Sequence, residues 1–190
     1  MDKGDNIKKI LEGCLNKDAK SQRALVDKYA SYLLITCKRY MNNDESAKDL
    51  VQDSFIKIFK NLEQYDANKG EFKSWITTLS IRLCLSKLRK RNLEVLSMDS
   101  DEDQILLSED SRLTLDSIET KYLIEMIKEL PDGYREVFNL AAIDGYSHKE
   151  IAEHLGIKEE ISRTRLARAR KKLRTKIENL NKEELWVNSI

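Results

Sequence analysis

The stretch SHKEIAEHLGIKEEISRTRLARARKKLR, residues 147–174, contains nine Lys or Arg but only four acidic residues. Ser147 and Glu150 have the S-x-x-E spacing of a capping box, in which each side chain bonds the backbone N–H of the other residue. A short helix is therefore expected to start there and to end before a left-handed turn at Gly156. A second, basic helix is predicted over residues 159–177.

The apolar residues of this stretch fit two helices that cross each other. A small residue stands where the helices would meet, glycine occupies the turn, and apolar residues lie beneath: Ile151, Ala152, Leu155, Ile157 and Leu166. This arrangement is typical of a helix-turn-helix, with Ile157 predicted to enter the core.

The basic residues of the second helix lie outside its inward stripe, opposite Leu166 and to the sides. At 100° per residue, the inward stripe is Ser162, Leu166, Ala169 and Leu173. The other faces carry the residues that we expect to contact DNA: Arg163, Thr164, Arg165, Ala167, Arg168 and Lys171. Arginine reads guanine edges in the major groove, whereas lysine and threonine contact phosphates or base edges. A solvated basic face is the alternative, and the helix-turn-helix frame favours DNA binding.

Charge divides the 190-residue chain into three parts, although the formal net charge is only +1. Residues 1–91 carry a net charge of +7, residues 92–120 one of −8, and residues 121–190 one of +2. Two basic modules joined by an acidic segment are typical of a protein with an anionic partner. We expect two domains, 1–91 and 118–190, and a linker over 92–117. The linker acts either as a solvating spacer or as an acidic segment that folds back on a basic module.

Helical periodicity dominates the chain, so the expected fold class is all-α, with two small helical domains. Helices are predicted over 18–41, over 47–62 with Asn43 or Asp44 as the cap, and from Glu71 to the sequence LRKRN. The third helix should bury Phe72, Trp75, Ile76, Leu79 and Leu83. Further helical segments are expected at TKYLIEMIKEL and between Pro131 and Gly145.

Several function classes are excluded by composition. The three cysteines, Cys14, Cys37 and Cys84, lack metal-site or disulfide-framework spacing and are expected in the core. His148 and His154 have no third ligand nearby, so a helical surface role is expected and no metal. No nucleophile–base pair or phosphate-binding glycine loop suggests an enzyme, a cofactor or a small-molecule substrate. With neither a signal core nor a long apolar run, a cytoplasmic location is expected.

The segment LPDGYREVFNLAAIDGYSHKEIAEHLGIKEEISRTRLARARKKLR resembles the fourth conserved region of bacterial sigma factors, specifically the extracytoplasmic-function (ECF) group. The resemblance implies that this module recognises the −35 element of promoters. The chain departs from the family pattern at Lys158, Glu160 and Ile161, where a small polar cap and a glycine-threonine pair are usual.

The segment DLVQDSFIKIFKNL resembles the second conserved region, which docks on a coiled coil of the largest polymerase subunit. Spacing alone places four residues on a second stripe beside the buried one: Asp49, Gln52, Asp53 and Ile56. Two carboxylates, an amide and an isoleucine suit a basic, partly apolar helical partner. An ordinary acidic helix face is the alternative.

The next helix and the loop before it resemble the promoter-melting segment of the family. Single-stranded DNA is held by aromatic side chains that stack on bases and by positive charge along the backbone. The residues expected at the melted −10 strand are Lys57, Lys60, Asn61, Tyr65, Lys69, Trp75 and Arg82. Phe72 is expected in the core instead, and Arg82 stands where the family commonly has asparagine.

The predicted function is therefore an alternative sigma factor. Its expected partners are core RNA polymerase, duplex −35 DNA, the melted −10 strand and, from the resemblance, an anti-sigma factor. Two rivals remain: a stand-alone helix-turn-helix regulator with an N-terminal dimerisation or sensing bundle, and a sigma-like protein used as a regulator. The apolar tail residues Trp186, Val187 and Ile190 either dock on the second module or contact a partner.

Overall fold

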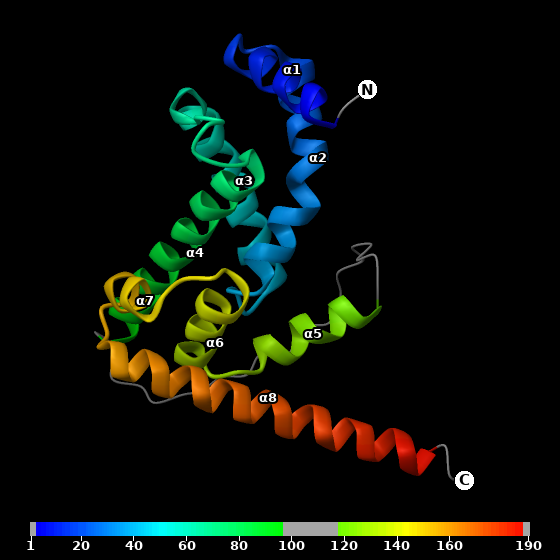
Figure 1. The fold of residues 1–190 in the computed structure, drawn as a ribbon, viewed down its shortest axis with the longest axis vertical. Helices are drawn as coiled ribbons and strands as arrows, with labels where there is room; N and C mark the ends of the chain where they lie inside the picture. Colours follow the sequence, from blue (N-terminus) through cyan, green and yellow to red (C-terminus); the bar gives the residue numbers. More distant parts are fainter. Residues whose placement is uncertain (1–2, 97–117, 188–190) are drawn as a thin grey trace. The chain divides into compact units, whose positions relative to one another are not determined.

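The computed structural model describes residues 3–96 and 118–187, and all regular structure in those two ranges is helical. The chain forms two compact units, Met1–Asp101 and Glu102–Ile190 (Figure 1). The all-α prediction is confirmed. The predicted linker, residues 92–117, lies almost wholly outside the described residues, apart from its first residues, which are helical. No helix of the described ranges is long and apolar enough to cross a bilayer.

The first unit contains four α-helices and one 3-10 turn: α1 (Lys3–Leu15), α2 (Ala19–Lys38), α3 (Asp44–Asn61), η1 (Leu62–Gln64) and α4 (Phe72–Leu96). Helix α2 packs against α1, α3 and α4, and α3 also packs against α4. Asp18 and Asn43 cap α2 and α3 by accepting hydrogen bonds from Ser21 N and Ser46 N, at 2.8 and 2.7 Å.

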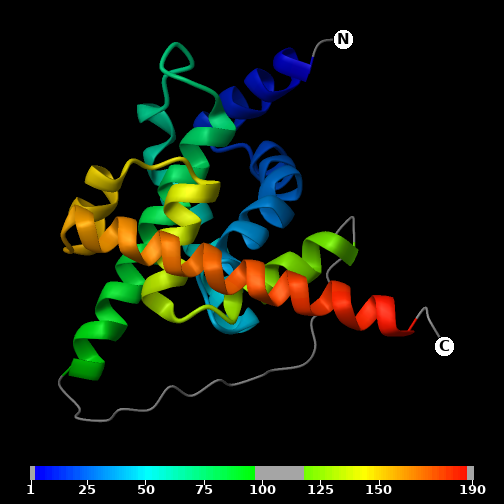
Figure 2. The same cartoon turned by 60° about the horizontal axis from the view of Figure 1, so that its bottom comes forward.

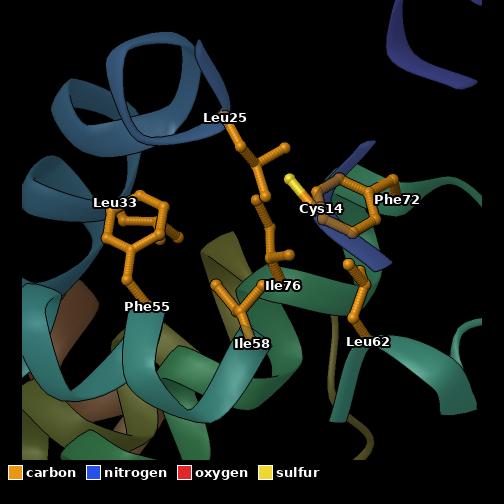
Figure 3. Packing of buried hydrophobic residues seen from close by; sticks show 8 residues of the cluster. All are labelled: Cys14, Leu25, Leu33, Phe55, Ile58, Leu62, Phe72 and Ile76. Atoms are coloured by element: carbon orange, nitrogen blue, oxygen red, sulfur yellow. The ribbon is translucent and has the colours of Figure 1, made fainter. Parts of the chain in front are cut away.

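The core of this unit receives side chains from all four of its α-helices (Figure 3). The cluster consists of Cys14, Leu25, Leu33, Phe55, Ile58, Leu62, Phe72 and Ile76. All three cysteines are buried, as predicted, and none of them is in a disulfide within the described ranges. The apolar spacing over 47–62 predicts one buried stripe, and the structure confirms it. Its members Ala47, Leu50, Ser54, Phe55, Ile58 and Leu62 are buried, and Val51 is half-buried.

Two features of the first unit differ from the sequence prediction. Helix α1 was not predicted, although Ile7, Ile10 and Leu11 have helical spacing and pack on the core. Gly13 allows α1 to approach α2, because a Cβ there would lie 2.0 Å from Ser21 Oγ. Helix α4 runs to Leu96, past the predicted end at LRKRN.

The second unit contains α5 (Ile118–Lys128), α6 (Asp132–Phe138), the π-helical turn η2 (Asn139–Ile143), α7 (His148–Leu155) and α8 (Glu159–Val187). Helix α8 packs against α6 and α7, and Figure 2 shows α6 crossing α8. The segment between Pro131 and Gly145 is helical as predicted. Its last turn widens because Tyr146 N donates to Leu140 O and Asp144 N to Asn139 O, both at 2.9 Å.

The helix-turn-helix is confirmed, except for the predicted burial of Ile157. Both halves of the capping box form, and Gly156 adopts φ 67° and ψ 34°, the left-handed conformation. Ile151, Leu166 and Ala169 are buried, but Ile157 is only half-buried, because it lies at the edge of the turn rather than inside the core. Helix α8 continues ten residues past the predicted end at Ile177 and includes Trp186 and Val187.

Candidate nucleic-acid and protein interfaces

The second stripe of α3 is exposed over its whole length. Asp49, Gln52 and Asp53 are exposed, and Ile56 keeps 52% of its surface accessible. The opposite face is anchored in the core by Leu50, Phe55 and Ile58, which fixes the direction in which the stripe points. The stripe therefore exposes apolar, amide and acidic groups side by side. These four residues form the α3 stripe.

The loop between α3 and α4 encloses an aromatic cluster. The ring centroids of Tyr65, Phe72 and Trp75 lie 5.1–5.7 Å apart, and Tyr29 meets Phe72 edge-on at 5.5 Å. Phe72 is buried, as predicted, whereas Tyr65 and Trp75 are half-buried. The hydroxyl of Tyr65 donates to Gly70 O at 3.1 Å, which closes the loop. The cluster can offer an aromatic surface to a base.

The polar residues predicted around this cluster have different surroundings. Lys57, Lys60, Lys69 and Arg82 are exposed, and Lys69 is 3.8 Å from Asp66. Asn61 is half-buried and bonded locally. Its Nδ2 donates to Lys57 O at 2.7 Å, and its Oδ1 accepts from Gln64 Nε2 at 3.2 Å. The amide therefore holds the end of α3.

One cation of the predicted melting segment faces a neighbouring helix. Lys73 Nζ lies 4.1 Å from the ring centroid of Tyr32, a cation–π contact between α4 and α2. The Tyr32 hydroxyl and Thr77 Oγ1 are 3.0 Å apart on the same side. This triad joins α2 to α4.

The helix-turn-helix is held by a bond between its two helices. His148 Nδ1 and Ser162 Oγ lie 2.8 Å apart, and Ser162 is fully buried. His148 therefore joins α7 to α8, rather than only occupying the surface as predicted. His154 meets the Tyr146 ring edge-on at 5.5 Å. Within the described ranges, no group of three or more His, Cys, Asp or Glu could hold a metal ion.

The basic residues predicted to contact DNA lie on α8 outside its buried stripe. Ser162, Leu166 and Ala169 are buried, and Leu173 is half-buried. The exposed residues are Arg163, Thr164, Ala167, Arg168 and Lys171. Two of the predicted residues are bonded within α8 itself: Arg163 Nη2 donates to Glu159 Oε2 at 2.8 Å, and Thr164 Oγ1 donates to Glu160 O at 2.8 Å.

Sequence reasoning missed one neighbour of this face. Tyr134, at the start of α6, accepts a hydrogen bond from Arg168 Nη1 at 3.3 Å. This bond, followed by the charges of Arg168, Lys172 and Arg165, lowers the pKa of the Tyr134 phenol. No local pattern marks the contact, because the two residues are 34 positions apart and meet only where α6 crosses α8.

Comparison with known proteins assigns both units. A family model described as Sigma-70 region 2 matches residues 25–94, and one described as Sigma-70, region 4 matches residues 120–173. The chain is 30% identical over 187 residues to the ECF RNA polymerase sigma factor SigW of Bacillus subtilis (strain 168), covering 92% of this chain and 98% of that protein. The chain belongs to the ECF sigma factors.

Other relatives agree with this membership. The ECF sigma factor SigE of Mycolicibacterium smegmatis is 29% identical over 159 residues, covering 79% of this chain and 59% of that protein. The sigma factor RpoE of Bartonella quintana, solved with the anti-sigma factor NepR, has a similar fold. Its TM-score is 0.54 at 21% identity, over 84% of this chain and 98% of that one. This ECF sigma factor is therefore a transcription initiation factor that acts with core RNA polymerase on promoter DNA, not a stand-alone regulator.

Proposed function

We propose that each of the three surfaces of this ECF sigma factor has one task in initiation. The α3 stripe binds core RNA polymerase, the aromatic loop before α4 holds the melted −10 strand, and α8 lies against the −35 element. The α3 stripe carries this proposal most directly: acidic, amide and apolar groups are exposed together on a helix whose other face is buried. This combination suits a basic, partly apolar helix of the polymerase.

The −10 contact is proposed to work by stacking and charge. Tyr65 and Trp75 offer ring surface to a base, while Lys57, Lys60, Lys69 and Arg82 are exposed to meet the phosphate backbone. Each base stacked on an aromatic side chain contributes about 1–3 kcal/mol, which offsets part of the cost of opening the duplex. Asn61, bonded to the end of α3, positions the loop in this proposal. Binding energy drives melting, so the chain needs no catalytic residue of its own and is not an enzyme.

The −35 contact is proposed for the exposed face of α8. The capping box, the turn at Gly156 and the His148–Ser162 pair fix α8 against α7. This leaves Thr164, Arg168 and Lys171 facing outward, where they can meet the major groove and the phosphates beside it. Ala167 lies next to them and allows close approach to a base. Arg163 and Arg165 stand at the margins and contact phosphates.

The same proposal includes the boundaries of the two domains, the cellular location of the protein and a regulatory partner. The polymerase and −10 surfaces lie in residues 1–91, the −35 surface lies in 118–190, and 92–117 connects them. A factor that acts with RNA polymerase works in the cytoplasm. An anti-sigma factor is proposed as a further partner, supported by the solved complex of the RpoE relative with NepR.

The test is reconstituted transcription. The purified protein would be mixed with core RNA polymerase and genomic DNA fragments, and the 5′ ends of the transcripts would be sequenced. We expect start sites that appear only when the protein is present and that share two upstream elements at fixed distances. A protein that fails to bind polymerase but binds tightly to a symmetric DNA site would overturn the proposal.

A further inference from the structure

We propose that Tyr134 of α6 belongs to the −35 surface, where its hydroxyl and the guanidinium of Arg168 together bind one backbone phosphate of the promoter duplex. The proposal rests on the function assigned above to α8. It adds a residue from outside the helix-turn-helix, and it assigns Arg168 to the DNA backbone rather than to a base edge.

The packing of α6 on α8 brings Tyr134 to this position. Gly133 lies directly under Arg165: a Cβ there would be 2.9 Å from Arg165 Nη1 and 3.0 Å from Arg165 Cζ. The absent side chain lets the first turn of α6 approach α8 closely. The Tyr134 ring consequently lies beside α8, half-buried, with its hydroxyl at the edge of the exposed face.

The hydrogen bond between the two side chains leaves the donors that a phosphate requires. Because Arg168 Nη1 donates to the Tyr134 oxygen at 3.3 Å, the phenolic proton of Tyr134 is available to another acceptor. The guanidinium has further N–H groups beyond the one used. The positive charges that lower the pKa of Tyr134 also make its O–H a stronger donor. The pair can thus present convergent donors to one anionic oxygen.

The groove around this pair is lined by side chains that can donate hydrogen bonds. Its lining consists of Tyr134, Arg168, Lys171, Lys172 and Thr175. All five side chains carry hydrogen-bond donors, and three are cations. The groove is open and lies along the exposed side of α8, where an extended polyanion can enter. A DNA backbone fits this chemistry, since it presents a phosphate at every nucleotide.

The direction of Arg168 argues for the backbone rather than a base. When a recognition helix lies in the major groove, residues at its N-terminal end meet base edges. Arg168 is in the third turn of α8, away from that end, and is bonded to Tyr134 of α6. A contact of this kind fixes the position of α8 on DNA without reading sequence.

The test uses holoenzyme reconstituted with core polymerase and a duplex promoter fragment recovered by start-site mapping. Binding would be measured for the wild type, Tyr134→Phe, Arg168→Ala and the double variant, at several salt concentrations. The matched control is Tyr122→Phe, because Tyr122 is an exposed tyrosine on α5 of the same unit. Thermal unfolding of each variant would establish that it folds. Single phosphates flanking the −35 element would then be replaced in turn by neutral methylphosphonates.

We expect Tyr134→Phe to weaken binding about tenfold, because a hydrogen bond to a charged acceptor is lost. The salt slope should stay unchanged, since no cation is removed. Arg168→Ala should weaken binding to every promoter variant similarly and reduce the salt slope by about 1. One methylphosphonate should weaken the wild type but cause no further loss in the double variant.

Three outcomes would overturn the inference if the wild type supports transcription. In the first, Tyr134→Phe binds the promoter as tightly as the wild type; in the second, Arg168→Ala loses affinity only when one particular base pair is present. In the third, no methylphosphonate weakens binding to an extent that depends on Tyr134. Absence of transcription by the wild type with core polymerase would instead contradict the proposed function itself. The two failures are therefore distinguishable.

Discussion

At the scale of single residues, the start of α7 depends on two side chains. Ser147 N donates to Glu150 Oε2 at 2.8 Å, and Glu150 N donates to Ser147 Oγ at 3.3 Å. We expect Ser147→Ala to lower the unfolding free energy of the second unit by about 1 kcal/mol, because an N-terminal N–H of the helix loses its partner. Urea unfolding followed by circular dichroism measures this. An unchanged midpoint would show that water replaces the cap without cost.

The same pair predicts a pH dependence. Hydrogen bonds from the side chain and backbone of Ser147 lower the pKa of Glu150 below its ordinary value of 4.5. A lowered folded-state pKa adds stability above the unfolded-state value, and this stability is lost as the pH falls through the folded-state pKa. Glu150→Gln should therefore lose less stability than the wild type between pH 6 and pH 3. Glu153→Gln, exposed on the same helix, is the control. Parallel wild-type and Glu150→Gln curves would contradict the prediction.

Gly156 tests the turn between α7 and α8. Its φ of 67° is left-handed, and a Cβ there would meet nothing within 4 Å. Gly156→Ala should therefore cost about 1–2 kcal/mol through backbone strain alone. Gly156→Asn should cost less, since asparagine tolerates this conformation. The measurement is the unfolding free energy of both variants, and equal losses would indicate a packing effect instead.

At the scale of elements, the helices that bury only one face could be predicted from the sequence. Helices α3 and α7 each bury one face, so apolar spacing and cap residues located them. Helix α4 was less predictable: Ile81, Cys84, Leu85 and Leu88 are buried, whereas Trp75, Leu79 and Leu83 of the predicted stripe are only half-buried. Helix α1 was missed because only a few apolar residues, Ile7, Ile10 and Leu11, carry its helical spacing.

The candidate surfaces follow the same rule. The α3 stripe could be located from sequence, because the apolar spacing identifies the buried face of the helix and the remaining positions must then be exposed. The exposed residues of α8 could be located in the same way. Tyr134 could not, since its contact with Arg168 depends on where α6 crosses α8. The engagement of Arg163 by Glu159 also depends on rotamers that spacing does not specify.

The α3 stripe gives a prediction at this scale. Asp53→Lys should weaken binding to core RNA polymerase at least tenfold, because a cation would face the basic partner surface. Asp53 is exposed, so thermal stability should change little. The matched control is Asp27→Lys, a reversal of charge at an exposed position on α2. Binding to core polymerase would be measured for both variants. Equal losses would show that net charge matters and that the stripe does not.

At the scale of the whole molecule, an acidic segment separates two basic parts of the chain. The +7 of residues 1–91 and the basic helix α8 are separated along the chain by residues 92–120, which carry a net −8. The fold-back hypothesis is that, in the free protein, the nine carboxylates of this segment compete with DNA phosphates for the same cations. Attraction of this kind is strongest at low salt and falls with screening, since the Debye length is about 10 Å at 0.1 M.

Replacing the nine acids of residues 92–120 with Asn or Gln should therefore raise the affinity of the free protein for promoter DNA at low salt. The gain should shrink as salt rises, because salt screens the competition that the acids exert. The measurement is a salt series of DNA binding by fluorescence anisotropy, with Ser97, Ser100 and Ser108 replaced by glycine as the neutral control. If affinity is unchanged at the lowest salt, the segment serves as a solvating spacer, and the fold-back hypothesis is wrong. If the glycine control gains equally, chain flexibility rather than charge sets the affinity.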